Sequence, residues 1–523
     1  MDEAVEIIIT GSKLQNTQTI LSFFISGINN FFFYLIPYLL QSPSLSNNLH
    51  LTNITNNNNY TLEEFCKSEN NNNNEINKYI DINNYSTIYK LFCEENSFQI
   101  QVLIFLYFFS KGISSFFFGY FTDKFGRKFI FSYCSILSII SSFFMFLSLY
   151  NYYCLIIAFI LLGACSFWYI FSSIIIPEYL DRNKSATISS FNIASGPIFA
   201  IIFILLLKVF INLQYVYIII FISTLIIFYY IKRHFNESLY FLISRNKVNE
   251  FFNVLQSLSI INERKSLYEK INQERYITDK IKEYSFTANI QDIFNYDSQN
   301  RRLLIHTLLW IFSSLSFHGI FNMLSLYNIF DNFYYIHFTF FIICIVTQIF
   351  IGIISDIYGR RMPLIYSFYL NSISYLIYIV TEEKIVIKKI FFFISMITSS
   401  SIYSILFIFS SEDFPTILRG TVLGFLFGIS QIAALIIYYI KSPLVLCLII
   451  SLSNCIGGRI VESMEDTFDI LLDDTFPEMF KNDNLKKKKY RALKCERIST
   501  GSDLYFLTSD DDAFNRESQF KFS

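Results

Sequence analysis

Charged side chains are scarce in this sequence. Only 16% of the 523 residues are Asp, Glu, Lys or Arg, whereas 53% are hydrophobic. A soluble chain of this length would carry charge on about a quarter of its residues. Here the apolar residues gather in blocks of about 20, the length that crosses a hydrocarbon core about 30 Å thick. The composition therefore excludes an ordinary soluble protein and predicts an all-α integral membrane protein.

Motifs of enzymes and of nucleic-acid binding are also missing. The sequence has no nucleotide-binding loop, no His/Cys cluster at metal-ligand spacing and no nucleophile motif. We therefore expect no enzymatic activity, no cofactor and no metal. The formal net charge of −1 indicates no nucleic-acid partner. The first residues, MDEAVEIIITGSKLQNTQ, are too acidic and polar for a cleaved signal peptide, which predicts an uncleaved first span.

Twelve apolar segments predict twelve transmembrane helices in two six-helix halves. The expected spans are residues 19–40, 99–121, 129–149, 152–175, 188–210, 213–232, 303–325, 333–354, 363–381, 389–411, 420–440 and 442–458. The last is the shortest and weakest. We expect an N-terminal bundle at 1–233, a central loop at 234–301, a C-terminal bundle at 302–460 and a tail at 461–523.

Lys and Arg indicate the orientation, because they concentrate on the cytoplasmic side of membrane proteins. The stretch 232–302 contains twelve of them, whereas residues 41–98 contain only Lys67, Lys78 and Lys90. This bias predicts that both termini are cytoplasmic, which requires an even number of spans. We expect a monomer in a lipid bilayer, with the plasma membrane favoured over an endolysosomal or vesicle membrane.

The loop at 41–98 is rich in Asn and is expected to face the extracellular or lumenal side. It contains three N-x-S/T sequons, at Asn53, Asn59 and Asn84, which predict glycosylation there. Cys66 and Cys93 are its two cysteines, and on the oxidising side they are expected to form a disulfide; the alternative is two unpaired thiols.

A short charged turn occurs twice, once in each half. The stretch GYFTDKFGRK (119–128) follows the second span, and GIISDIYGRR (352–361) follows the eighth. Such a turn can latch two helices in one conformation and release them in another; the alternative is a plain basic loop. The latch candidates in the two turns are Gly119, Asp123, Gly126, Arg127, Lys128, Gly352, Asp356, Gly359, Arg360 and Arg361.

These paired turns resemble the signature loop of the major facilitator superfamily, and the resemblance covers about residues 1–475. NESLYFL (236–242) is similar to a further motif of that family, without its proline and arginine. SEDFPTILRGTVLG (411–424) and RRLLIHTLLWIFSSLSFHG (301–319) resemble segments of its organic cation and anion transporters. The resemblance adds Glu412, Arg419 and Glu178, the last with Arg182 or Lys184, to the latch candidates.

In that fold spans 1, 4, 7 and 10 line a central cavity, with help from 2, 5, 8 and 11. Both tryptophans of the chain lie in lining spans, at positions 168 and 310. Their rings could stack on a flat substrate, although packing against protein or lipid is the commoner fate of an aromatic side chain. The expected cavity residues in these spans are Trp168, Tyr169, Trp310, Phe317, His318 and Asn322.

Ionisable residues inside the spans are few and therefore informative. No Asp or Glu lies in the middle of an expected span, whereas Lys111 lies near the centre of the second. The position that discriminates charge in the resembling transporters is the neutral Gln431. Together these predict a neutral to mildly positive cavity for an anionic, zwitterionic or neutral organic solute rather than a cation. Without a coupling carboxylate, facilitated diffusion or exchange is favoured over proton symport.

Two other functions stay open. A sugar porter for a hexose or polyol would share the charged turns and a similar motif after the sixth span. A transporter-like receptor or vesicle protein that moves no solute would share the fold, although it would not need a gating latch.

Overall fold

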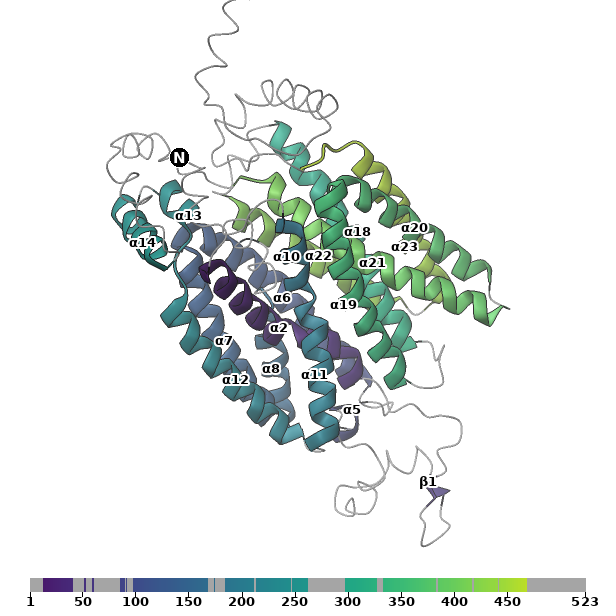
Figure 1. The fold of residues 1–523 in the computed structure, drawn as a ribbon. Helices are drawn as coiled ribbons and strands as arrows, with labels where there is room; N and C mark the ends of the chain where they lie inside the picture. The colour runs from purple at the N-terminus through teal and green to yellow at the C-terminus, as the bar shows by residue number, and fades with distance from the viewer. Residues whose placement is uncertain are drawn as a thin grey trace, which may run out of the picture. The chain divides into compact units, whose positions relative to one another are not determined.

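The computed structural model is almost entirely helical (Figure 1). It describes residues 13–40, 51–52, 59–60, 85–89, 91, 97–167, 174, 184–210, 213–245, 247–261, 297–326, 333–381, 384–415, 418–440 and 442–467. All of these belong to one compact unit, Met1–Asp474. The strands there are β1 (Leu51–Thr52) and β2 (Asn59–Tyr60), which pair antiparallel.

The first half begins with one long helix and continues with six more. These are α2 (Lys13–Leu40), α6 (Ser97–Phe125), α7 (Arg127–Leu147), α8 (Tyr152–Cys165), α10 (Ser185–Ile193), α11 (Ser195–Phe210) and α12 (Leu213–His234). The short helix α5 (Tyr85–Ile88) lies between α2 and α6 in the chain. Two further helices, α13 (Leu239–Ser244) and α14 (Val248–Ile261), follow α12.

The second half consists of six long helices. They are α18 (Asp297–Leu326), α19 (Phe333–Tyr358), α20 (Arg361–Val380), α21 (Ile385–Asp413), α22 (Arg419–Tyr439) and α23 (Pro443–Glu462). Within the described residues, eleven helices are long and apolar enough to cross a membrane, with α10 and α11 counted as one span. The expected fourth span is represented by α8, a shorter apolar helix, and most of that span's remainder lies outside the described residues.

The last expected span, residues 442–458, is longer in the structure than the sequence predicted. The helix α23 has 20 residues and ends at Glu462 rather than at 458. Pro443 occupies its first turn, where the missing N–H costs nothing. Its polar side chains bond to nearby carbonyls, as Asn454 does to the Ile450 oxygen at 2.8 Å, so they can lie in an apolar helix.

The helix α6 shows how the sequence divides each span between lipid and protein. Phe105, Phe109, Ile113 and Phe117 are exposed and recur every four residues along one face. The opposite face buries Tyr107, Lys111, Ser115 and Phe118. An apolar exposed stripe on a helix of this length fits a membrane-spanning segment, with the polar side chains turned inward.

The two halves repeat the same helix pairings. In the first half α2 packs on α11, α6 on α8, and α7 on both α8 and α12. In the second half α18 packs on α22, α19 on α21, and α20 on both α21 and α23. The halves meet through α6 against α22 and through α10 and α11 against α19. This is a pseudo-symmetric pair of six-helix bundles.

Candidate functional site

The first charged turn holds a buried carboxylate against a helix of the other half. Asp123, near the end of α6, accepts hydrogen bonds from the backbone N–H of Gly420 (3.2 Å) and of Thr421 (2.7 Å). The Thr421 hydroxyl donates a third, at 2.8 Å. These groups begin α22, whose N-terminal N–H groups and helix dipole favour an anion. Asp123 therefore ties α6 to α22, and we call this contact the first latch.

Arg127 supports the first latch from the start of α7. Its Nη1 lies 3.5 Å from Asp123 Oδ1 and donates to the Thr122 carbonyl at 3.3 Å. Its guanidinium also lies 4.8 Å from the centroid of the Phe241 ring. Gly126, between α6 and α7, has a φ of 107°, which side-chain-bearing residues rarely adopt. The turn therefore needs glycine at this position.

Glu237 completes this turn, although the sequence alone gave it no role beyond its place in NESLYFL. Its carboxylate accepts from the backbone N–H groups of Arg127 (2.8 Å) and Lys128 (3.1 Å), so it caps the N-terminus of α7. Burial raises the pKa of Glu237, while the nearby Arg127 guanidinium and the backbone donors lower it. Lys128 contributes a backbone N–H to this contact.

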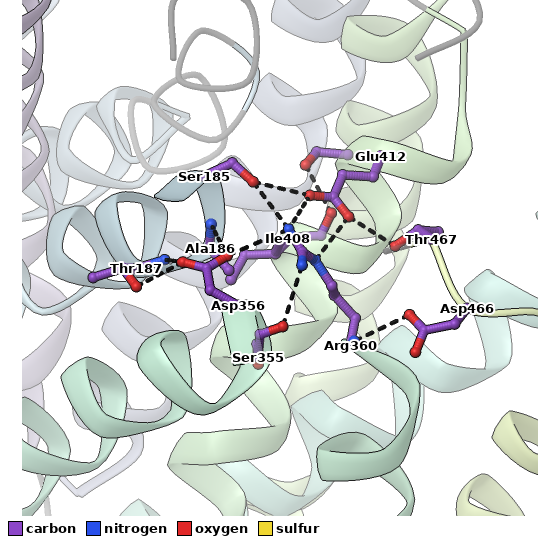
Figure 2. Close-up of polar contacts among 11 residues, drawn as sticks. Ser185, Ala186, Thr187, Ser355, Asp356, Arg360, Ile408, Glu412, Asp466 and Thr467 are labelled. Atoms are coloured by element: carbon purple, nitrogen blue, oxygen red, sulfur yellow. Dashed lines mark hydrogen bonds and ion pairs between the residues drawn. The ribbon is translucent and has the colours of Figure 1, made fainter. Parts of the chain in front are cut away.

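The second charged turn repeats this geometry, as Figure 2 shows. Asp356, near the end of α19, accepts from the backbone N–H of Ala186 (3.2 Å) and Thr187 (2.8 Å) and from the Thr187 hydroxyl (2.6 Å). These groups lie at the start of α10 in the first half. Asp356 therefore ties α19 to α10 as Asp123 ties α6 to α22. We call this contact the second latch.

Arg360 is the centre of the second latch. Its Nε and Nη2 donate to the two carboxylate oxygens of Glu412, at 3.0 and 2.9 Å (Figure 2). Such a fork of two parallel bonds is among the stronger side-chain interactions. Nη2 also donates to the Ser185 hydroxyl at 3.0 Å, and Nη1 donates to the Ser355 carbonyl at 3.2 Å. Glu412 accepts a further bond from the Thr467 hydroxyl at 2.7 Å.

Asp466 occupies the place in the second half that Glu237 has in the first. It accepts from the backbone N–H of Arg360 at 3.1 Å, at the start of α20. Gly359 has a φ of 86°, matching Gly126. The sequence analysis missed Asp466, which follows the last span as Glu237 follows the sixth. That matched position after the two halves was the signal that could have found it.

The other latch candidates lie around the same two turns. The Arg361 guanidinium donates to the Glu462 carbonyl at the end of α23. Arg419 is fully buried at the first position of α22, next to Gly420, and donates to the Phe414 carbonyl at 3.4 Å. A methyl group added at Gly119 would lie 2.5 Å from the Gly420 carbonyl oxygen, so these helices touch backbone to backbone.

Lys111 lies between the two halves, surrounded by aromatic rings. Its Nζ is 4.4 Å from the centroid of the Phe33 ring, 5.8 Å from that of Tyr107 and 5.2 Å from that of Phe427. Phe33 and Tyr107 belong to the first half, and Phe427 belongs to the second. The side chain is 1% exposed. Within the part of the chain that the structure describes, no carboxylate or other hydrogen-bond acceptor bonds to Nζ.

His318 and Phe317 pack against the same ring from the second half. The His318 ring lies edge-on to Phe33, with centroids 5.2 Å apart, and edge-on to Phe108 at 4.9 Å. Phe317 stacks on Phe33 at 5.9 Å and on Tyr403 at 4.7 Å. Lys111, His318 and Phe317 therefore share one site. We call the group Phe33, Tyr107, Lys111, Phe317, His318 and Phe427 the central cage.

Polar atoms without partners lie in and beside the central cage. His318 Nε2 is buried and has no hydrogen-bond partner among the described residues, while its Nδ1 lies 3.4 Å from the Tyr438 hydroxyl. Gln431, one turn along α22 from Phe427, donates to the Ser430 hydroxyl at 3.2 Å, but its Oε1 has no partner in the described segments. A buried polar atom without a partner is costly, and a bound molecule could satisfy these two.

Two of the expected cavity residues use their polar atoms within the second half instead. The Trp310 indole N–H donates to the Ser410 hydroxyl at 2.9 Å, and its ring packs edge-on to Phe407 at 4.6 Å. The Asn322 amide donates to the carbonyls of Ile437 (2.7 Å) and Ile440 (3.2 Å), at the end of α22. These contacts favour a packing role, the alternative that the sequence left open.

Several expected residues lie outside the described residues. They are Trp168 and Tyr169 of the fourth span, Glu178 and Arg182, the sequon residues Asn53 and Asn84, and the cysteines Cys66 and Cys93. Asn59 begins β2, and only its backbone is described. The disulfide, the glycosylation sites and the contribution of the fourth span stay predictions.

The arrangement contains two kinds of site, the latches and the central cage. The latches join the halves at one end through carboxylates on helix N-termini, contacts that separate if the halves move apart. The central cage offers one cation, several ring faces and free polar atoms, which suit an organic molecule with an anionic group and an apolar body.

Comparison with known proteins gives one consistent result. The Major Facilitator Superfamily model matches residues 19–438. Solute carrier family 22 member 10 of Homo sapiens is 24% identical over 382 residues, which are 70% of this chain and 69% of that protein. The proton:xylose symporter XylE of E. coli shares the fold at a TM-score of 0.62 and 11% identity, over 89% of this chain and 96% of its own. The human organic anion transporter MFSD10 (TETRAN) does so at 0.55 and 11%, over 88% and 99%.

Proposed function

Because this chain belongs to the major facilitator superfamily, we propose that it moves a small organic solute with an anionic group across its membrane by alternating access. The chain is a multi-pass membrane transporter and not an enzyme. The observation that carries the choice of solute is Lys111, a buried cation among rings from both halves with no carboxylate bonded to it in the described residues. Zwitterions and neutral solutes with an acceptor group fit the same cage less fully.

An organic cation fits this cage poorly. Lys111 would repel it, and the neutral Gln431 offers no compensating charge. The described carboxylates near the ends of the spans, such as Asp123 and Asp356, already accept hydrogen bonds in the latches. The similarity to solute carrier family 22 member 10 and to an organic anion transporter supports this choice.

The two latches would hold one end of the transporter closed while the other end opens. Their separation would free the N-termini of α10 and α22 and expose the cage from the opposite side. We place the latches on the cytoplasmic side, together with both termini, because Lys and Arg concentrate there. Facilitated diffusion or exchange, in a monomer at the plasma membrane, is the simplest mode consistent with the absence of a mid-span carboxylate.

Uptake into proteoliposomes tests the solute class. Purified protein should take up labelled benzenesulfonate, a flat permanent anion, and unlabelled tetraethylammonium or glucose should compete weakly. Lys111→Ala should reduce this uptake, whereas the matched control Lys388→Ala should not, because Lys388 lies over the Tyr378 ring at 4.9 Å, in a different part of the molecule. Uptake of tetraethylammonium or of glucose in preference to the sulfonate would overturn the proposal, glucose in favour of a sugar porter. Absence of flux for all three probes would contradict it in favour of a receptor.

A further inference from the structure

Among the residues that the structure describes, none near Lys111 supplies a counter-ion to its ammonium. The cage and the rings packed on it present these titratable groups from six helices: Tyr34 on α2, Tyr107 on α6, Cys165 on α8, His318 on α18, Tyr403 on α21 and Tyr438 on α22. Phenols and thiols ordinarily ionise only above neutral pH, and imidazole never carries negative charge. None of these groups supplies an anion at neutral pH.

The charge of Lys111 is therefore tied to what occupies the cage. Burying an unpaired ammonium is costly, and the ring faces of Phe33 and Phe427 offset only part of that cost. The empty cage consequently holds the neutral amine at lower cost than the ammonium. An anion that enters the cage reverses this preference, because it supplies the missing counter-ion.

We propose that Lys111 carries one proton with each anion in net transport. This inference rests on the proposed function. The neutral amine takes up one proton and one anion on one side, the neutral ion pair crosses as the halves rearrange, and both are released on the other side. The amine then returns empty and uncharged. The cycle moves no net charge and needs no carboxylate to carry the proton.

This coupling separates two modes of transport. In exchange, one anion replaces another while Lys111 keeps its proton, so the flux requires no proton movement. In net transport the proton must leave with the anion. Net transport is then not facilitated diffusion of the anion alone. It is the electroneutral movement of one proton and one anion together.

Transport of labelled benzenesulfonate tests the coupling, because this strong acid does not cross lipid as a neutral molecule. Proteoliposomes with the interior one pH unit more alkaline should accumulate it about tenfold at equilibrium, the ratio for one proton per anion. A membrane potential set with potassium and valinomycin should leave the accumulation unchanged. A dye for internal pH should report acidification only when the sulfonate is present.

Lys111→Arg isolates the role of the proton. Arginine keeps its charge at all accessible pH values, so the variant should lose net uptake and internal acidification far more than it loses exchange, whereas Lys388→Arg should match the wild type in the ratio of the two fluxes. Coupled net uptake by Lys111→Arg would place the proton elsewhere and overturn the inference. Wild-type net flux that follows the membrane potential would also overturn it, without affecting the proposed function. Failure of both exchange and net flux in the wild type would instead overturn the proposed function.

Discussion

Arg360 and Lys111 are two cations that are almost equally buried and differently surrounded. The exposed fraction is 2% for Arg360 and 1% for Lys111. Arg360 binds both oxygens of Glu412 and lies 3.5 Å from Asp356. Lys111 faces the rings of Phe33, Tyr107 and Phe427. Burial of the charge is the same, and only the partners distinguish the two sites.

This difference separates a residue that holds helices together, Arg360, from the residue that we propose binds the solute, Lys111. A buried charge with built-in partners stabilises one arrangement of the helices, and removal of one partner leaves the other uncompensated. A buried basic side chain without a partner is costly in either protonation state and adds no stability to the empty protein. Substitutions on the two sides of this comparison should therefore affect stability in opposite directions.

The largest effect is expected from Glu412→Gln. Gln keeps the shape of the side chain but removes the two-bond ion pair and leaves the buried Arg360 guanidinium with the more distant Asp356, at 3.5 Å, which should cost about 3 kcal/mol. The Tm in detergent should fall by several degrees, and a single cysteine placed at the latch end should react faster with a maleimide reagent. The double variant Arg360→Met with Glu412→Leu should recover much of the lost stability. An unchanged Tm for Glu412→Gln would contradict the structural role of this pair.

Lys111→Met should have the opposite effect, since it should lower uptake without lowering the Tm. Loss of a charged hydrogen bond to the solute should lower benzenesulfonate uptake by about 10- to 100-fold, which corresponds to about 1.5 to 3 kcal/mol. The Tm should stay equal or rise, because a buried amine without a hydrogen-bond partner in the described residues has been replaced by an apolar side chain. Lys388→Met should leave uptake unchanged. A lower Tm with normal uptake would place Lys111 among the structural cations.

Alanine at the matched glycines Gly119 and Gly352 should reduce the stability of the protein by different amounts. A methyl group at Gly119 would lie 2.5 Å from the Gly420 oxygen and 2.9 Å from the Gly424 Cα, both backbone atoms. At Gly352 the closest atoms are the Cβ and Oγ of Ser190, both at 2.7 Å, and the Ala186 backbone oxygen at 3.0 Å, so the contact is somewhat looser. We expect Gly119→Ala to cost about 2 kcal/mol and Gly352→Ala about 1 kcal/mol. Thermal unfolding of both variants gives the order, and a larger loss for Gly352→Ala would contradict it.

The smallest effect concerns Glu237 and pH. Burial raises its pKa in the folded protein, so the folded protein holds this proton more tightly than the unfolded chain. Its contribution to stability is therefore full below its ordinary pKa and falls as pH rises through the raised value. Glu237→Gln stays neutral throughout. The Tm of the variant relative to the wild type should consequently increase between about pH 4 and pH 7, and a difference that decreases over this range would reverse the assignment.

Much of the fold could be predicted because a helix needs about 20 apolar residues to cross the hydrocarbon core of a membrane. The repeated turns also indicated two similar halves and resembled the superfamily, whose model matches residues 19–438. The length of α23 was underestimated because the expected span stopped before Arg459, although this side chain pairs with Glu462 within the last turn of the helix. The sequence pattern records the polarity of a side chain but not whether its hydrogen bonds are satisfied.

The candidate site was less accessible to sequence reasoning. Lys111 stood out because charge is rare in the spans, and Asp123 and Asp356 stood out because their turns repeat. Phe33 and Phe427 could not be selected from 61 phenylalanines, since their role depends on helices that come together only in the fold. Trp310 was selected because tryptophan is rare in this chain, but its indole N–H donates to the Ser410 hydroxyl.

Where α6 meets α22, glycine backbones form much of the contact. Gly119 faces Gly420 and Gly424, and Gly112 faces Gly428. Glycine has no rotamers to freeze, so closing this surface costs little side-chain entropy and opening it regains little. The balance between the joined and parted halves at this seam therefore depends mainly on the few hydrogen bonds of Asp123. A single carboxylate can in this way bias the populations of the two states of the transporter.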